Sequence, residues 1–191
     1  MEHEIRADYD DRHITVYQAY SPAIAEPALA AGRFVPPFKP GRMTWVKPSF
    51  LWMMHRCGWG AKPDQERVLA VRITRTGFDW AVSAAVPSHE VGRGKPDVRV
   101  QWDPERDLRL NPLPHRSLQL GLAGGASRRY VEEWVVGITD VTPLAHEVRD
   151  LVRAGDLDAA RARLPVERPY PWPATDRATT DRATTDRVTT G

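Results

Sequence analysis

Residues 13–32 read H-I-T-V-Y-Q-A-Y-S-P-A-I-A-E-P-A-L-A-A-G, and this stretch indicates what kind of fold the chain adopts. Its first part alternates in polarity and is rich in β-branched and aromatic side chains, which predicts a strand over residues 13–20. Ser21 and Pro22 are residue types that begin a helix, and Gly32 is a type that ends one. A strand followed directly by a helix predicts a fold that contains both kinds of element.

The rest of the chain continues this mixture. Runs rich in β-formers predict further strands at residues 42–46, 68–74, 98–102, 117–122 and 134–141. Helix-forming runs predict helices at residues 48–56, 77–85, 126–132, 142–153 and 157–163, two of them with the N-caps Thr76 and Asp156. Proline and glycine predict irregular structure at residues 34–41, 86–96 and 104–114. We therefore expect an α+β fold, a single domain with a mixed, mostly antiparallel sheet flanked by short helices.

The C-terminal part of the chain has a different character. Residues 175–189 repeat the unit T-D-R-A-T, with valine replacing alanine in the last copy, and offer almost nothing to bury. Such a segment is expected to be disordered. Residues 165–173, P-V-E-R-P-Y-P-W-P, are interpreted as an extended linker, with a proline-rich partner motif as the alternative. The expected domain is residues 1–164, followed by a linker and tail at residues 165–191.

Composition excludes several classes of protein. The 27 basic side chains nearly balance the 25 acidic ones, which argues against a surface that is basic throughout but permits a local basic cleft. No apolar run is long enough for a membrane span, and the charged N-terminus lacks the apolar region of a secretion signal. We therefore expect a cytoplasmic protein without a membrane partner. The histidines are scattered and Cys57 is the single cysteine, so no metal is expected.

The densest group of chemically active side chains is R-M-T-W-V-K-P-S-F-L-W-M-M-H-R at residues 42–56. On the predicted helix, one face carries Ser49, Trp52, Met53 and Arg56, and Lys47 lies just before it. An aromatic ring beside cations suits a nucleotide, whose base stacks while its phosphates pair with the charges. The first turn of the helix, with its free N–H groups, also favours an anion. The alternative is that Trp52 packs beneath an arginine stem in an ordinary core.

Three classes of function are consistent with this group. The first is an enzyme that binds a nucleotide or dinucleotide. The second is a nucleic-acid-binding module without catalytic activity, in which the same tryptophans and cations would contact successive nucleotides. The third is a scaffold or regulatory protein in which these tryptophans are simply core.

Several segments together resemble a bacterial family, domain-of-unknown-function family 4291. They are Y-Q-A-Y-S at residues 17–21, the block at residues 42–56, E-R-V-L-A-V-R-I-T at residues 66–74 and R-S-L-Q-L-G-L at residues 116–122. The resemblance covers about residues 4–152.

The order of the predicted elements is also similar, more distantly, to that of the ADP-ribosyltransferase superfamily. This resemblance implies a split sheet, NAD as the bound nucleotide and transfer of ADP-ribose to an acceptor. In that superfamily a first-strand Arg or His holds the nicotinamide ribose, a Ser or Tyr shapes the nicotinamide pocket, and a late Glu or Gln stabilises the oxocarbenium-like transition state. Carried onto this sequence, the late acid is Glu133 or Glu132, and Ser49 takes the middle role. Gln18 stands at the first-strand position unless His13 fills it.

The expected site therefore combines one acid with a set of ligand-binding residues. Glu133 is the expected catalytic residue, and the expected nucleotide-binding residues are Tyr17, Gln18, Tyr20, Arg42, Trp45, Lys47, Ser49, Trp52, Arg56 and Gln119. Within this set the arginines and Lys47 would contact phosphates, and Trp45 or Trp52 would stack on a base. Gln119 lies between Leu118 and Leu120, which face the other way on a strand, so its side chain points into a cleft or into solvent.

Overall fold

The computed structural model describes residues 3–90 and 95–172. The predicted disordered repeat at residues 175–189 lies outside the described residues, as do residues 91–94 of the loop predicted at residues 86–96.

The first sheet has three antiparallel strands in the order β2-β4-β8. They are β2 (His13–Tyr20), β4 (Arg67–Thr74) and β8 (Val135–Asp140). The strand β2 has the predicted bounds, and its apolar side chains at Ile14 and Val16 are fully buried. The bounds of this strand were thus predicted correctly, although residues 14–18 are all buried and the burial does not alternate.

The second sheet has four strands in the order β3-β7-β6-β5. They are β3 (Thr44–Val46), β7 (Pro112–Leu122), β6 (Val98–Arg106) and β5 (Val86–Pro87), and only the short pair β5–β6 is parallel. Two short strands, β1 (Arg6–Ala7) and β9 (Arg168–Pro169), form a separate two-stranded sheet. The predicted α+β class with mostly antiparallel sheets is confirmed.

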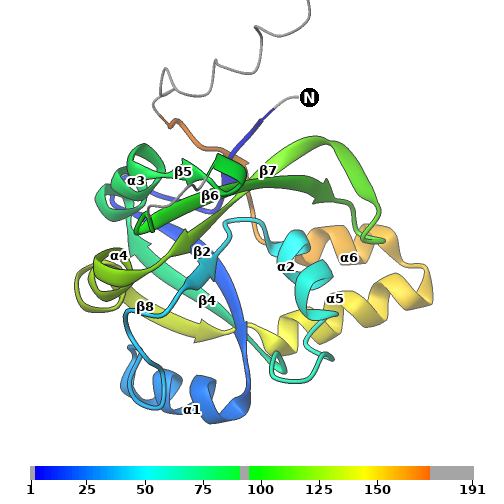
Figure 1. The fold of residues 1–191 in the computed structure, drawn as a ribbon. Helices are drawn as coiled ribbons and strands as arrows, with labels where there is room; N and C mark the ends of the chain where they lie inside the picture. The colour runs from blue at the N-terminus through cyan, green and yellow to red at the C-terminus, as the bar shows by residue number, and fades with distance from the viewer. Residues whose placement is uncertain (1–2, 91–94, 173–191) are drawn as a thin grey trace, which may run out of the picture.

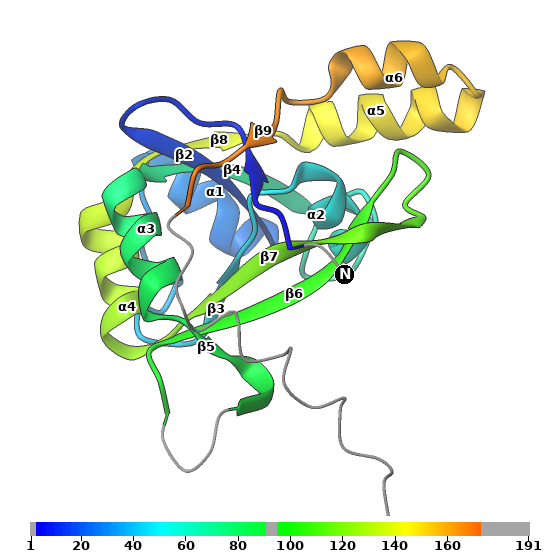
Figure 2. The same cartoon turned by 90° about the horizontal axis from the view of Figure 1, so that it is seen from above.

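Helices cover the sheets in groups (Figures 1 and 2). They are α1 (Pro22–Ala31), α2 (Phe50–Cys57), α3 (Arg75–Ala84), α4 (Gly124–Arg129), a π-helical turn (Tyr130–Trp134), α5 (Thr142–Ala154) and α6 (Leu157–Arg163), with a 3-10 turn at Ser88–Glu90. The helices α5 and α6 lie side by side at one end of the molecule, and α3 and α4 lie at the other end. The helix α2 is set between these groups, next to the second sheet.

Several predicted boundaries differ from the structure. Thr74, not Thr76, caps α3, because its hydroxyl accepts a hydrogen bond from the Gly77 N–H and β4 therefore runs straight into the helix. The helix α2 begins at Phe50 rather than at residue 48, since Ser49 is its N-cap. Residues 104–114 were expected to be irregular, but β6 and β7 extend into them as a hairpin, because the Asp107 carboxylate accepts backbone N–H groups and closes the turn.

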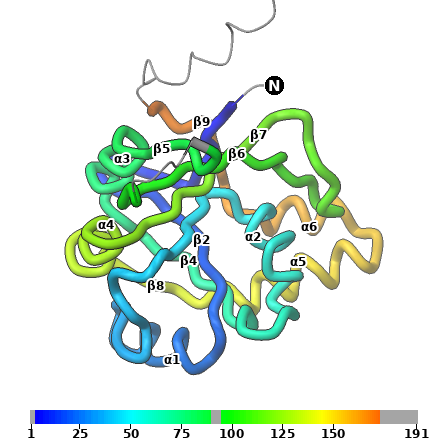
Figure 3. Tube along the Cα trace, viewed as in Figure 1, coloured from blue at the N-terminus to red at the C-terminus, as the bar shows by residue number. Residues whose placement is uncertain are grey.

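The segment predicted to be a linker packs on the domain through residue 172. Its strand β9 pairs with β1, so the two ends of the described chain lie side by side (Figure 3). Tyr170 is only 4% exposed and belongs to the main hydrophobic core, and Trp172 packs against that core. The prediction that the folded unit ends near residue 164 therefore differs from the structure, because the aromatic rings between the prolines bury apolar surface.

We predict that Gly77→Ala lowers the free energy of unfolding. A Cβ atom at this helical position would lie 2.4 Å from the Trp134 ring, which fills the core beneath α3. Repacking costs about 1–3 kcal/mol, more than the ~1 kcal/mol that alanine gains over glycine in a helix. Urea denaturation followed by circular dichroism measures the difference. Gly137→Ala is the matched control, since nothing lies within 4 Å of its Cβ position, and a more stable Gly77→Ala variant would contradict the packing at this point.

Candidate functional site

A cavity of about 610 Å³ lies where the two sheets meet. The sheets are joined through the bridge between Tyr17 and Lys47, whose backbone groups exchange hydrogen bonds of 2.7 and 3.4 Å. Most of the predicted nucleotide-binding residues line this cavity, namely Gln18, Tyr20, Trp45, Lys47, Trp52, Arg56 and Gln119. The structure thus brings together residues from β2, β3, α2 and β7 that lie far apart in the sequence.

Lys47 is fully buried in the wall of this cavity. Its ammonium Nζ lies 3.4 Å from Asp103 Oδ2 and 3.5 Å from the centroid of the Trp52 ring. Burial lowers the pKa of Lys47 to about 7, although the carboxylates of Asp103 and Glu105 act in the opposite direction. A lysine with this pKa is partly neutral at pH 7, and an anionic ligand would favour its charged form.

A polar face of β6 and β7 forms the floor beneath Lys47. In the register of this pair, Gln101 lies opposite Gln119 and Asp103 lies opposite Ser117. The Gln119 amide Nε2 donates hydrogen bonds to Gln101 Oε1 (2.5 Å) and to Asp103 Oδ2 (2.8 Å). Both amide hydrogens are therefore used within the sheet, and the Gln119 carbonyl oxygen has no hydrogen-bond partner among the residues that the structure describes.

Gln101 and Asp103 were not predicted as site residues. Their signal in the sequence is the alternation at residues 101, 103 and 105, where polar side chains occupy every second position of a strand. That pattern also describes an ordinary solvent-facing strand, so the sequence alone did not separate the two cases.

Gln18 organises a network of neutral hydrogen bonds behind the cavity. Its Nε2 has two hydrogens and lies within hydrogen-bond distance of three acceptors, which are Thr44 Oγ1 (2.7 Å), the Tyr20 hydroxyl (2.9 Å) and the Trp45 carbonyl oxygen (3.1 Å). Its Oε1 accepts a hydrogen bond of 2.7 Å from the Tyr130 hydroxyl. Burial raises the pKa of Tyr20 to about 12, so this phenol stays protonated at neutral pH. The network ties β2 to β3, and its polar atoms are engaged within the protein.

A glycine makes room for the indole of Trp45. Gly121 lies directly opposite Trp45 in the β3–β7 pair. A Cβ atom at Gly121 would lie 2.9 Å from both the Trp45 ring and the Met43 sulfur, closer than real contacts allow. The absence of a side chain on β7 therefore lets Trp45 and Met43 lie across the strand and form one wall of the cavity.

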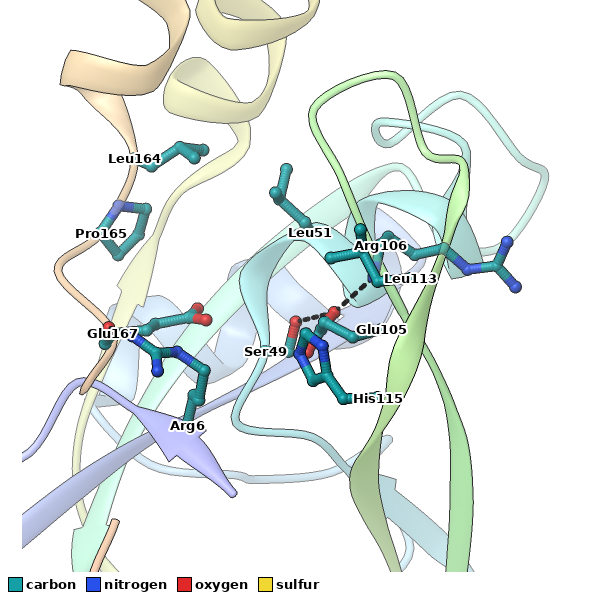
Figure 4. A pocket seen from close by; sticks show the side chains of 10 residues that line it. All are labelled: Arg6, Ser49, Leu51, Glu105, Arg106, Leu113, His115, Leu164, Pro165 and Glu167. Carbon is teal, nitrogen blue, oxygen red and sulfur yellow. Dashed lines mark hydrogen bonds between the residues drawn. The ribbon is translucent and has the colours of Figure 1, made fainter. Parts of the chain in front are cut away.

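Three predicted binding residues do not line this cavity. Tyr17 is 2% exposed and packs edge-on against Phe50 in the core. The Ser49 hydroxyl accepts a hydrogen bond from the Trp52 N–H and donates one of 2.7 Å to Glu105, in a different hollow (Figure 4). Arg42 is exposed and precedes the first residue of β3 in the chain. Ser49, a predicted nucleotide-binding residue, is instead the N-cap of α2, and its hydroxyl is engaged by the helix and by Glu105.

Glu133, the predicted catalytic acid, is not among the residues that line the cavity. Its side chain is 57% exposed and forms an ion pair with Arg129 at 3.3 Å, one helical turn away. The π-helical turn directs Tyr130 and Trp134 inward and leaves both Glu132 and Glu133 exposed. His13, the alternative first-strand residue, pairs with Asp10 at the opposite end of β2 from Gln18.

Across residues 3–90 and 95–172, no three His, Cys, Asp or Glu side chains cluster in a way that could hold a metal ion. None of the helices described there has the length and apolar character required to cross a bilayer.

A known protein family matches most of this chain. The family described as Domain of unknown function (DUF4291) matches residues 4–170. The chain belongs to the DUF4291 family. The DUF4291 match extends beyond residue 152, to which the resemblance in the sequence reached, and it includes β9, in agreement with the packing of that segment. Searches among curated proteins and among solved structures give no match. These comparisons provide no support for the resemblance to ADP-ribosyltransferases.

We predict that Lys47→Met changes how stability depends on pH. Because the folded-state pKa of Lys47 is lowered to about 7 from 10.5, the unfolded chain binds more protons between these values, and the stability contributed by Lys47 rises with pH across this interval. Below pH 7 Lys47 is protonated in the folded and the unfolded state alike, and the stability that it contributes at higher pH is lost. Lys47→Met should remove this positive slope in urea titrations performed between pH 7 and 10. The exposed Lys39→Met is the control and should retain it; parallel slopes in all three proteins would show that Lys47 titrates normally.

Proposed function

We propose that the cavity at the junction of the two sheets binds NAD and that the protein transfers ADP-ribose to an acceptor. The observation that carries this proposal is the convergence of a buried lysine, an arginine, two indoles and the hydrogen-bonded pair Gln101 and Gln119 on one hollow of about 610 Å³. This volume lies within the usual ~300–1,000 Å³ range for small-molecule sites, which combine apolar walls with a few oriented polar groups.

In this proposal the cations of the cavity contact the phosphates. Arg56 is exposed on the last turn of α2, whereas Lys47 is buried at the start of that helix. A pyrophosphate extending from one to the other would gain a charged partner at each end. It would also supply the negative charge that favours the ammonium form of Lys47.

Trp45 is the stronger candidate for stacking on a base. Its ring is partly exposed along the cavity wall beside Gly121, whereas Trp52 is 7% exposed and already covered by the Lys47 ammonium group. We assign Trp45 to the ligand and Trp52 to the support of Lys47.

Gln119 takes the late-strand role in this proposal. Asp103 and Gln101 hold both of its amide hydrogens, so its carbonyl oxygen can accept a hydrogen bond from a ribose hydroxyl. A partial negative charge there would stabilise the positive charge that develops at the anomeric carbon when nicotinamide departs with the bonding electron pair. A neutral amide supplies less of this stabilisation than a carboxylate. The negative charge of Asp103, which is hydrogen-bonded to the Gln119 amide, adds to the stabilisation.

The alternative function is binding of nucleic acid without catalysis. Successive stacked bases require exposed aromatic rings along an open surface. The enclosed positions of Trp52 and Lys47 favour a single nucleotide instead.

We predict that NAD raises the melting temperature of the protein more than a short single-stranded oligonucleotide does. A ligand present at about 100 times its Kd stabilises the folded state by roughly 2.7 kcal/mol. Thermal-shift measurements with NAD, ADP-ribose, ATP and the oligonucleotide compare the candidates. Stabilisation by the oligonucleotide alone, with steep loss in salt, would support the nucleic-acid function, and no shift with any of them would contradict both.

We predict that Gln119→Ala reduces release of nicotinamide from NAD by about 10²-fold, the usual effect of removing one stabilising group from a reacting centre. The Kd for NAD, measured by calorimetry, should change much less, because most of the contacts with the ligand remain. Glu133→Gln tests the other assignment. If that variant loses nicotinamide release while Gln119→Ala retains it, the exposed acid and not the cavity glutamine carries the reaction.

A further inference from the structure

A second hollow, of about 240 Å³, lies where the start of α2, the β6–β7 hairpin and the segment after α6 meet (Figure 4). It is distinct from the cavity described above, with which it shares no lining residue. Its volume is below that of sites for drug-sized ligands, so it would hold only a small molecule.

Two carboxyl groups, those of Glu105 and Glu167, contribute to the polar lining of this hollow. Glu105 is 7% exposed, and its Oε1 accepts hydrogen bonds from the Ser49 hydroxyl (2.7 Å) and the Arg106 N–H (2.8 Å). Glu167 Oε1 accepts a hydrogen bond of 2.7 Å from the Phe50 N–H. Figure 4 shows the Glu167 carboxyl group pointing toward Ser49 and Glu105.

Each of these carboxyl groups keeps one oxygen without a hydrogen-bond partner among the residues that the structure describes. Glu105 Oε2 and Glu167 Oε2 make no hydrogen bond within that part of the chain, and both residues line the hollow. Glu105 is more than nine-tenths buried and Glu167 is half-buried, and a buried carboxylate with an open oxygen is costly unless a donor reaches it. The buried Nε2 of His115, beside Glu105 in Figure 4, also has no partner there.

Neither neighbouring arginine has a hydrogen bond to the open oxygens of Glu105 and Glu167. Arg6 donates to the Glu4 carboxylate (3.0 Å) and to the Glu167 carbonyl oxygen (3.1 Å). Arg106 donates to the Leu110 carbonyl oxygen (3.3 Å), and Figure 4 shows its guanidinium group pointing away from the hollow. The open polar atoms of the two acids are therefore acceptors that lack a charged donor.

The remaining wall of the hollow is apolar. It is formed by Leu51, Leu113, Leu164 and Pro165. This surface would cover methylene groups while the carboxyl groups receive a charged head.

We propose that this hollow binds a small organic cation, an alkylammonium or alkylguanidinium ion, with Glu105 and Glu167 as its anionic partners. The charged head donates to the open oxygens of both acids, and the alkyl part packs against the leucines. Nothing in this assignment depends on the NAD proposal, because the two sites share no lining residue.

The nearby positive charge of Arg6 does not offset the effect of burial on Glu167. Burial raises the pKa of Glu167 to about 8, and the nearby Glu105 and Asp8 raise it further, against the lowering effects of the Phe50 N–H and Arg6. His115 from β7 and Arg106 from β6 are the other titratable groups lining this hollow. A cation that favours the ionised carboxylate binds with release of a proton, so its affinity should increase from pH 6 to pH 9.

Calorimetric titration with n-butylguanidinium chloride tests the proposal. We expect saturable binding to the full chain that strengthens with pH and weakens by about tenfold or more in Glu105→Gln and in Glu167→Gln, since each loses a charge-assisted hydrogen bond. The control Glu147→Gln removes a surface charge that pairs with Arg163 and should bind as the wild type does. Equal binding of sodium butyrate, or no binding of the guanidinium ion to the wild type, would overturn the proposal.

A lysine side chain of another protein would offer the same ammonium group. An end-blocked Gly-Lys-Gly peptide distinguishes that source from a free amine, represented by n-butylammonium chloride. Should the glutamine variants fail to fold, backbone amide NMR of the wild type decides the matter. Addition of n-butylguanidinium must shift the signals of Ser49, Phe50 and His115, and shifts confined to other parts of the chain would contradict the site.

Discussion

The bridge between Tyr17 and Lys47 is the constraint on which the rest of the site depends. It is the backbone contact through which β2 of one sheet meets the residue after β3 of the other, and it carries the Lys47 side chain into the interior. An ammonium group in that position requires partners, which Asp103 and the face of Trp52 supply. The cost of burying this charge thus couples the second sheet, the helix α2 and the junction between the sheets.

The β6–β7 hairpin connects the two hollows through its polar face. Gln119 and Gln101 line the cavity, Asp103 bonds Gln119 behind it, and Glu105 and His115 line the smaller hollow. The opposite face of β7 carries Leu118, Leu120 and Leu122, all of them buried in the core. The hairpin is therefore held by apolar packing on one side, which fixes the positions of polar groups that would otherwise lose side-chain entropy when they are ordered.

The helix α2 lies between these two regions and contributes to both. Its cap, Ser49, bonds Glu105 in the smaller hollow, while Trp52 and Arg56 line the cavity. Its first N–H group is bonded by Glu167, from a segment far away in the sequence. The end of the described chain thus helps to hold in place a helix that forms part of the candidate site, which gives the packing of residues 165–172 a consequence beyond stability.

Local patterns in the sequence determined the α+β class, the strand β2 and the helix α1 with its glycine stop. These features depend on neighbours in the chain, whose alternation, capping and turn preferences can be read directly. Tertiary structure alone decided that Lys47 is buried, that Ser49 is a cap, that Glu133 stays on the surface and that Gln119 is held by Gln101 and Asp103. Each of these depends on the register between strands and on contacts between distant residues, and a shift of one position in that register would reverse which side chains face the cavity.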